Sequence, residues 1–146
     1  MHIVSPQSEH DWKAYYDLRW QILRAPWQQP KGSEQDEFEP NAFHVMAKTD
    51  TGDIIGVGRI HCLRANTWQI RYMAIAENYR GAGIGSKILK KLEDYAQSNG
   101  AVEITLNSRT STLDFYLRHD YQIAGDAPTL FGEITHKNMR KILRIS

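Results

Sequence analysis

The stretch from Asn78 to Leu89, NYRGAGIGSKIL, places three glycines within five residues and leads into a run with helical periodicity. Arg80 stands directly before these glycines. Glycines at the first turn of a helix let a ligand approach the backbone closely. The unpaired amides and the dipole at a helix start favour an anion there. We therefore expect a strand, loop and helix arranged around a phosphate site.

Three kinds of phosphate site compete for this loop. A dinucleotide fingerprint needs Gly-x-Gly-x-x-Gly, but Ser86 takes the third position, and Glu103 lies near the start of the next strand. A dinucleotide fold also needs several strand-helix-strand units, and only one is present. A triphosphate loop needs Gly-Lys-Ser/Thr, which Ser86-Lys87 does not supply. Two interpretations remain. Arg80-x-x-Gly83-x-Gly85 either binds a pyrophosphate or forms a turn whose glycines only allow the helix to pack against the sheet.

The first half of the chain predicts a helix followed by an antiparallel meander. Residues 2–5 are strand-like, and Ser8 with Asp11 forms a capping-box pattern for a helix that ends at Pro26. Residues 25–42 are rich in breakers and predict a long loop, with Ser33 and Asp36 placed to cap a short turn. Three strands should follow, over residues 43–49, 54–64 and 68–75, with a hairpin turn at 50–53.

The second half predicts strand-helix alternation. The helix after the glycine loop should end at Asn99-Gly100. A strand over 102–107 follows, then a short helix capped by Ser111 and Asp114. Strands at 121–124 and 134–143 close the fold around a loop at 125–133. The whole order is typical of an α/β (α+β) fold with a mixed, mostly antiparallel sheet.

The overall composition bounds the class of protein. The chain has 146 residues, which fits a single domain over 1–146. Its formal net charge of +1 provides no field that would favour nucleic acid. One cysteine, Cys62, excludes an internal disulfide and fits a reducing compartment. We find neither a signal-peptide pattern nor an apolar run long enough for a membrane span, so we expect a cytoplasmic protein.

The glycine loop in its context resembles the GCN5-related N-acetyltransferase (GNAT) family. Arg-x-x-Gly-x-Gly between a strand and an amphipathic helix is similar to the family's acetyl-CoA signature, and TLDFYLRHDYQ resembles its second motif. The resemblance spans essentially the whole chain and implies six to seven strands with a splayed parallel pair. The stretches YYDLRWQILRAPWQQPKGSEQD and ITHKNM look more narrowly like the acetyltransferase half of bacterial acetyltransferase–thioesterase proteins. No thioesterase half is expected within these 146 residues.

The resemblance implies how acetyl-CoA would be held. The pyrophosphate should bind the loop and helix start, the pantetheine arm should pair with the preceding strand, and the next strand should splay away from it. The implied cofactor-binding residues are Met73, Ala74, Ile75, Arg80, Gly81, Ala82, Gly83, Ile84, Gly85, Ser86, Asn107 and Phe115. Two departures from the family pattern stand out. Asp120-Tyr121 replaces Gly-Phe, where Asp tolerates the left-handed conformation better than most residues, and Arg109 lies where many members carry Asn.

Transfer of acetyl to an amine requires the amine to lose a proton, because a lysine-type amine has a pKa of about 10.4. Tyr116, at the tyrosine of the second motif, is the implied acid for the leaving thiolate, with core packing as the alternative. His136 is our first candidate for the base, since histidine titrates in the right range. Glu133 and Glu37 are further candidates. Backbone N–H groups of residues 73–75 should stabilise the developing oxyanion.

The remaining candidates concern the acceptor, partners and metals. Arg71 and Arg59, on neighbouring strands, would bind an acidic group of the acceptor or form ion pairs. We expect a small-molecule or peptide amine as acceptor, and a non-catalytic acyl-CoA-binding module is the alternative function. His44 and His61 alone make a poor metal site, so we expect no metal. Exposed aromatics such as Trp20 and Trp27 would fit a homodimer.

Overall fold

The computed structural model of this protein describes residues 1–143, so the last three residues of the predicted domain lie outside the described range. The predicted order of strands and helices is confirmed. The elements are β1 (His2–Val4), α1 (Glu9–Leu23), β2 (Phe43–Lys48), β3 (Ile54–Arg64), β4 (Thr67–Ile75), α2 (Ile84–Ser98), β5 (Glu103–Arg109), α3 (Leu113–Leu117), β6 (Gln122–Leu130) and β7 (Ile134–Ile142).

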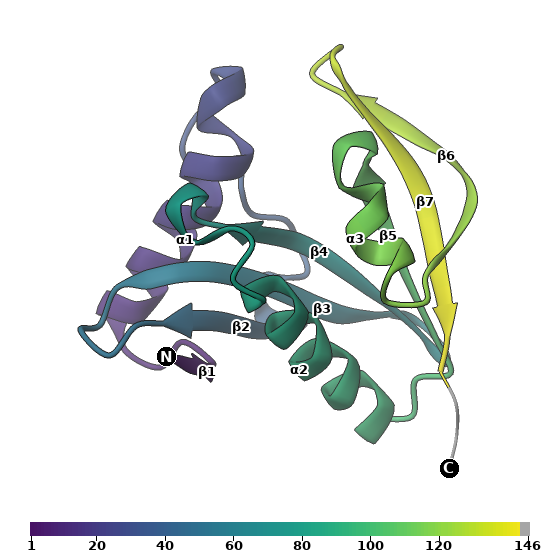
Figure 1. The fold of residues 1–146 in the computed structure, drawn as a ribbon, viewed down its shortest axis with the longest axis horizontal. Coiled ribbons are helices and arrows are strands. Elements are labelled where there is room, and N and C mark those ends of the chain that lie inside the picture. The colour runs from purple at the N-terminus through teal and green to yellow at the C-terminus, as the bar shows by residue number, and fades with distance from the viewer. Residues whose placement is uncertain (144–146) are drawn as a thin grey trace.

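The strands form a seven-stranded sheet in the order β1-β2-β3-β4-β5-β7-β6 (Figure 1). Every neighbouring pair is antiparallel except β4 and β5, which run parallel. These two strands pair only from Thr67–Ile70 to Glu103–Leu106, and beyond that point β4 stays with β3 while β5 follows β7. The sheet therefore opens between its two central strands, as the resemblance implied.

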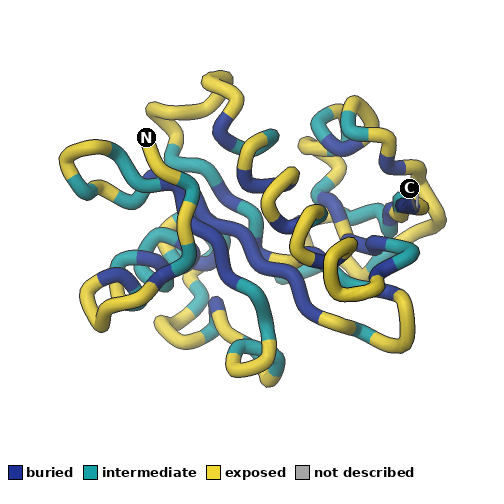
Figure 2. The backbone as a smooth tube through the Cα atoms, turned by 90° about the horizontal axis from the view of Figure 1, so that it is seen from below, coloured by how far each residue is buried: buried dark blue, intermediate teal, exposed yellow. Residues whose placement is uncertain are grey.

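The two long helices cover opposite faces of the sheet, and each closes its own hydrophobic cluster (Figure 1). Tyr15 of α1 packs with Met46 and Val57, while α2 buries Ile88 in the larger cluster. Figure 2 shows that the backbone between the two helices is the most deeply buried part of the molecule. On the α2 side a Cβ at Gly58 would lie 2.7 Å from Ile88, so glycine lets helix and strand approach this closely.

Three local signals in the sequence are confirmed. Ser8 and Asp11 form the capping box of α1, with each side chain accepting from the other's backbone N–H. Helix α2 ends at Ser98, followed by Asn99 and by Gly100 with a φ of 90°. Asp120 has a φ of 70°, so it takes the left-handed conformation predicted where the family motif has glycine.

Two predicted caps are wrong. Ser33 donates to the Pro30 carbonyl, and no helical turn begins at residues 33–36. A short 3-10 helix forms later in this loop, over Glu39–Asn41, and another forms at its start, over Ala25–Trp27. Helix α3 has Thr112 as its N-cap and no side-chain cap, so Ser111 and Asp114 do not cap it. At five residues it depends on tertiary packing more than on its ends.

The predicted loop over 125–133 is also wrong. Strand β6 continues through Gly125 and Pro128 to Leu130, and only residues 131–133 turn the chain into β7. Proline is tolerated because β6 is the edge strand of the sheet, where one row of N–H groups has no ladder to join. Strand β5 likewise continues two residues past the predicted end at Asn107.

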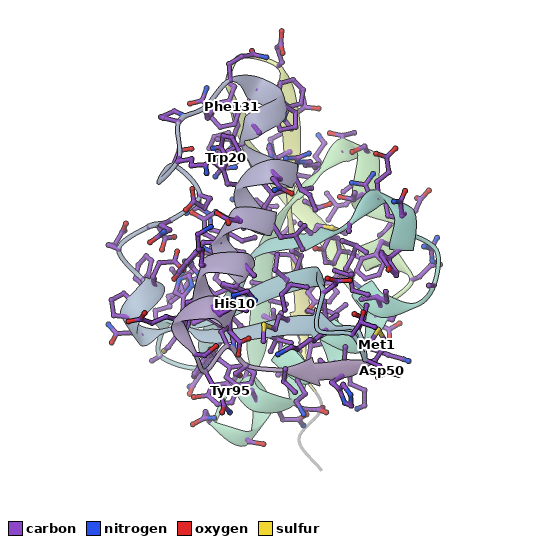
Figure 3. The ribbon with its side chains drawn as sticks, turned by 90° about the vertical axis from the view of Figure 1, so that its left-hand side faces the viewer. Met1, His10, Trp20, Asp50, Tyr95 and Phe131 are labelled. Carbon is purple, nitrogen blue, oxygen red and sulfur yellow. The ribbon has the colours of Figure 1, made fainter. Side chains whose placement is uncertain are left out.

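The aromatic residues suggested for a partner surface are partly buried instead. Trp20 donates its indole N–H to the Gln29 carbonyl at 3.0 Å and so holds the loop that follows α1. Trp27 is also half-buried. Figure 3 shows Trp20 at one end of the molecule, and Met1 beside Asp50 at the other, where the terminal ammonium donates to the Asp50 carboxylate at 2.9 Å.

Candidate active site

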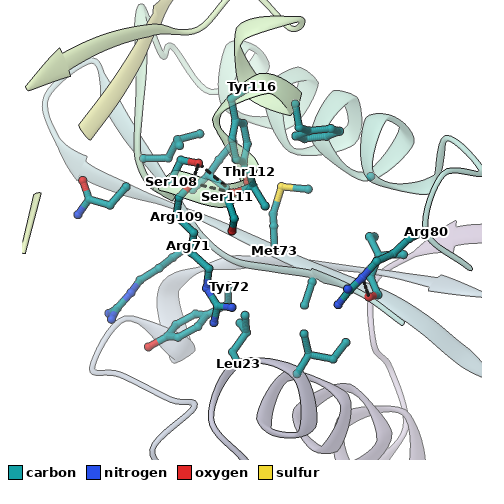
Figure 4. Close-up of a pocket in the computed structure, with 18 of the residues that line it drawn as sticks. Leu23, Arg71, Tyr72, Met73, Arg80, Ser108, Arg109, Ser111, Thr112 and Tyr116 are labelled. Atoms are coloured by element: carbon teal, nitrogen blue, oxygen red, sulfur yellow. Dashed lines mark hydrogen bonds between the residues drawn. The ribbon is translucent and has the colours of Figure 1, made fainter. Parts of the chain in front are cut away.

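A cavity of about 870 Å³ lies where β4 and β5 separate. Its walls come from the end of α1, β4, the glycine loop with the start of α2, β5, α3 and the β6–β7 hairpin (Figure 4). Eleven of the twelve predicted cofactor-binding residues line the cavity, Asn107 and Phe115 among them. Ala82 is the one predicted cofactor-binding residue that does not.

A β-bulge in β4 shapes one wall of the cavity. Arg59 pairs with Arg71 and Val57 with Ala74, so two residues of β4 face a single residue of β3. Tyr72, in the bulge, has a φ of 61°, a conformation rare for a bulky side chain. After the bulge, the Ala76 N–H donates to the Ile55 carbonyl on β3 at 2.8 Å. Since backbone directions alternate along a strand, the polar groups of Ile75 point to the open edge.

The glycine loop forms an anion seat at one end of the cavity. Gly81 and Gly83 have φ values of 83° and 79°, which glycine adopts at no steric cost. Helix α2 begins at Ile84 without a side-chain cap, so its first amides lack a carbonyl partner one turn earlier. Arg80 donates to the Ile75 carbonyl at 3.2 Å and lines the same cavity as Gly83 and Ile84. Positive charge and free donors together suit a pyrophosphate.

Gly85 has a packing reason as well. A Cβ there would lie 3.2 Å from the ring of Phe115, so the start of α2 rests against the Phe115 ring of α3. The Ser86 hydroxyl lies 2.9 Å from Nε2 of His119, which fixes α3 against α2 by a second contact. These contacts bring the second motif of the sequence to the same cavity as the glycine loop.

Tyr116 of α3 points into the cavity (Figure 4) and is 8% exposed. Among the described residues its hydroxyl has no hydrogen-bond partner. Burial raises the pKa of Tyr116 far above its usual value, so the hydroxyl keeps its proton at neutral pH. The side chain packs in the core cluster and also lines the cavity, and its role as the acid stays a prediction.

His136 and Arg109 face one another across the β5–β7 ladder, and both line the cavity. His136 Nδ1 lies 2.9 Å from the Ile134 carbonyl. Burial lowers the pKa of His136, and hydrogen bonds to backbone carbonyls oppose this while the charge of Arg109 adds to it. A histidine with a lowered pKa is neutral at pH 7 and can accept a proton.

The two glutamates suggested as bases are not brought to the cavity. Glu37 and Glu133 are both exposed, and neither lines it. Glu37 lies in the loop between α1 and β2, and Glu133 lies in the turn between β6 and β7. The cavity therefore offers His136 in preference to either carboxylate.

Arg59 is a correction to the predicted acceptor contacts, since the structure supports the ion-pair alternative. Its guanidinium is fully buried and binds the carboxylates of Asp36, at 2.5 Å, and Glu39, at 2.7 Å. Glu39 also binds the fully buried Arg19 at 2.9 Å. Arg71 differs, because it lines the cavity and is 41% exposed while it pairs with Asp36 at 2.8 Å.

These five residues, Arg19, Asp36, Glu39, Arg59 and Arg71, form a cluster that we call the buried ion cluster. Burial alone would raise the pKa of Asp36. Hydrogen bonds from Arg59 and the Phe38 amide, together with the charges of Arg59 and Arg71, outweigh the effect of burial and hold this pKa well below its usual range. The cluster ties the loop after α1 to β3 and β4, and so fixes the wall from which Arg71 reaches the cavity.

The cavity residues that were missed from the sequence include Arg24, Tyr72 and Arg118. Arg24 follows α1, is 7% exposed, and donates to the carbonyls of Ser33 and Leu23. Arg118 follows α3, and Tyr72 occupies the bulge. Arg118 falls inside the second motif and could have been noticed there. Nothing in the sequence marks Arg24, because only the tertiary fold brings the end of α1 to the open edge of β4.

Comparison with known proteins identifies the family. Residues 12–121 match the acetyltransferase (GNAT) family. The chain belongs to the GNAT family. It is therefore an N-acetyltransferase, and acetyl-CoA is the acetyl donor that members of this family use. The free amides, left-handed glycines and Arg80 at the start of α2 fit the anionic part of that donor.

Relatives and solved structures agree with this GNAT membership. The chain is 27% identical over 141 residues to the uncharacterized N-acetyltransferase YjcF of Bacillus subtilis (strain 168), covering 97% of this chain and 99% of that protein. An aminoglycoside 6'-N-acetyltransferase complexed with coenzyme A has the same fold, with a TM-score of 0.82 and 18% identity over the full length of both chains. A GNAT family acetyltransferase from Elizabethkingia anophelis with acetyl-CoA bound has a TM-score of 0.79 and 18% identity over 97% of both chains.

Two further points complete the comparison with the sequence. Within residues 1–143, none of the helices has the length and apolar character needed to cross a membrane. The narrower resemblance of this GNAT chain to acetyltransferase–thioesterase proteins stays a prediction.

Proposed function

We propose that this N-acetyltransferase moves acetyl from acetyl-CoA directly to a primary amine on a small molecule or peptide, with Tyr116 as the acid. A new C–N bond replaces the C–S bond of the thioester, and the proton that the amine loses is balanced by one that the CoA sulfur gains. The observation that carries the proposal is a protonated, unpartnered tyrosine hydroxyl in the cavity between the splayed strands.

The other residues have positioning and proton-transfer roles in this proposal. Arg80 and the amides at the start of α2 bind the pyrophosphate, and the open edge of β4 at Met73–Ile75 receives the pantetheine arm as an added strand would. Open-edge N–H groups of β4 are available to the charge that develops on the carbonyl oxygen. His136 accepts the proton of the amine, directly or through water.

We place this activity in the cytoplasm, because the one cysteine, Cys62, is free and exposed.

The test is Tyr116→Phe, assayed by release of the CoA thiol with acetyl-CoA and a panel of amines. General acids contribute about 10²–10⁴-fold to a rate, so kcat should fall at least about 100-fold. The KM for acetyl-CoA should stay within about twofold, because binding does not use the hydroxyl. Tyr95→Phe is the matched control, since Tyr95 is an exposed tyrosine of α2 outside the cavity. It should leave both constants unchanged.

Other results would change the proposal in distinct ways. Unchanged kcat in Tyr116→Phe would remove the acid role, and wild-type activity in His136→Ala would remove the base. Tight CoA binding with no thiol release on any amine would support the alternative of a non-catalytic acyl-CoA-binding module.

A further inference from the structure

The cavity is strongly cationic. Five arginines line it, with His136, and no aspartate or glutamate from residues 1–143 does so. The nearest acidic groups, in the buried ion cluster, already bind arginines there. Among residues 1–143, Arg71 is the only one of the lining arginines that has a carboxylate partner. The lining arginines are Arg24, Arg71, Arg80, Arg109 and Arg118.

These charges divide between two ends of the cavity. Arg80 belongs to the anion seat at the start of α2, next to Ile75. Arg71 is four residues further back along β4, and because of the bulge this spans the same length as the three steps from Gly56 to Arg59, about 10 Å of strand. Figure 4 shows Arg71 away from Arg80, with Arg109 next to Arg71, and the charges of both Arg24 and Arg80 reach Arg109. One end is therefore occupied by the pyrophosphate in the proposed function, and the other has cations that the pyrophosphate does not need.

Arg109 is the least compensated of these cations. It is half-buried, and no hydrogen bond or ion pair to another described residue holds its guanidinium. Burial, followed by the charges of Arg24 and Arg80, lowers the pKa of Arg109. Arg24 donates to backbone carbonyls and interacts with Tyr72, but no carboxylate from residues 1–143 neutralises its charge. A partly buried guanidinium without a counter-ion is costly, and an incoming anion would relieve that cost.

The same end of the cavity also has an apolar rim. Leu23 of α1 and Pro128 and Leu130 of β6 line it. The ring of Phe131, at the tip of the hairpin, lies 5.4 Å from the Arg24 guanidinium. An apolar rim next to uncompensated cations matches a ligand with an anionic group and an apolar body.

We infer that the acceptor is a primary amine that also carries a carboxylate next to an apolar body, as an apolar α-amino acid does. This inference rests on the proposed function and names its substrate class. Cationic surroundings also favour the neutral form of the acceptor amine, which reduces the demand on the base. A polycationic acceptor finds no carboxylate from residues 1–143 in this cavity. The likeness in fold to an aminoglycoside 6'-N-acetyltransferase therefore does not extend to the acceptor.

The test uses the full chain, acetyl-CoA and matched amines in the thiol-release assay. L-Leucine is compared with L-leucinamide, in which a neutral amide replaces the carboxylate, and with 3-methylbutylamine, which lacks the carboxylate. A charge-assisted pair adds about 1.5–3 kcal/mol, so kcat/KM should favour L-leucine at least about tenfold. O-phosphoethanolamine against ethanolamine tests phosphate as the anion, and kanamycin tests a polycation.

Arg109→Gln is the decisive variant. It should raise the KM for L-leucine at least about tenfold more than it raises the KM for L-leucinamide, and leave the KM for acetyl-CoA within twofold. Arg64→Gln, at the exposed end of β3 outside the cavity, is the matched control and should change none of these values. A rise in the KM for acetyl-CoA instead would assign Arg109 to the donor and overturn the inference.

The remaining outcomes separate this inference from the proposed function. Preference for L-leucinamide, 3-methylbutylamine or kanamycin would overturn the anionic class while transferase activity stood. Preference for O-phosphoethanolamine over L-leucine would overturn the carboxylate assignment. No turnover with any amine would refute the proposed function, and product binding then tests the charge preference alone. N-acetyl-L-leucine should bind the protein–CoA complex at least about tenfold tighter than N-acetyl-L-leucinamide, and equal binding would overturn the inference.

Discussion

Glu39→Gln should be the most damaging conservative substitution in the buried ion cluster. The Glu39 carboxylate binds Arg19 at 2.9 Å and Arg59 at 2.7 Å, and both guanidiniums are 0% exposed. Glutamine keeps the shape but removes the charge. Arg19 would then lose its carboxylate partner, and Arg59 would keep only Asp36, which it shares with Arg71.

The magnitude follows from the two interactions that lose their charge. Each charge-assisted hydrogen bond contributes about 1.5–3 kcal/mol, and breaking a buried ion pair on one side typically costs about 3–5 kcal/mol. We expect a loss of about 3–5 kcal/mol in the free energy of unfolding. With a typical urea slope of about 2 kcal/mol per molar, the unfolding midpoint falls by roughly 2 M. Equilibrium urea denaturation, followed by circular dichroism at pH 7.5, measures this shift.

Two comparisons make the result specific to the cluster. Glu37→Gln, in the same loop but exposed, should stay within about 0.5 kcal/mol of the wild type. Arg19→Met combined with Glu39→Gln should be less damaging than the sum of the two single changes by about 1 kcal/mol or more, because the partners are coupled. A loss below about 1 kcal/mol for Glu39→Gln, or strict additivity in the double variant, would refute the reasoning.

Two further predictions concern stability. Burial and the charge of Arg59, which donates to His61 Nδ1 at 3.0 Å, lower the pKa of His61 to about 4. The unfolded chain therefore binds the proton first, and stability is lost as pH falls below about 6.5. Urea midpoints should show about 1–2 kcal/mol less stability at pH 5 than at pH 7, with a flatter profile in His61→Gln. Equal slopes would contradict this assignment. Asp120→Val should cost about 1–2 kcal/mol in urea denaturation, because a β-branched residue is strained at the φ of 70°, whereas Asp120→Gly should not destabilise; equal losses would count against strain at this turn.

Features set by neighbours in the sequence could be predicted. The capping box of Ser8 and Asp11 spans three residues, and the anion seat depends on a few residues around Gly83. Both arise from local backbone conformation, so spacing alone indicates them. The order of elements followed in the same way from periodicity and turn residues.

Features set by distant residues could not be predicted. Asp36 pairs with Arg59 and Arg71, which lie 23 and 35 residues further along the chain, and nothing local distinguishes it from Glu37. Pairing with β7 made residues 125–130 extend β6 even though Pro128 and Gly125 are breakers, so a tertiary contact outweighed local propensity. The charge of the cavity was hidden for a similar reason, because its arginines come from five separate elements and loops.

The short pairing between β4 and β5 has a mechanical consequence. Within the sheet, only four residue pairs join the half with α1 and α2 to the half with β6, β7 and α3. The other links cross the wedge between helices, where Ser86 lies 2.9 Å from His119 and Gly85 packs on Phe115. Arg80 and the anion seat lie on one side of the wedge, whereas Tyr116 and His136 lie on the other. The alignment of the acid with the donor therefore depends on this short strand pairing and these helix contacts together, so a change at any of them would alter the distance between acid and thioester.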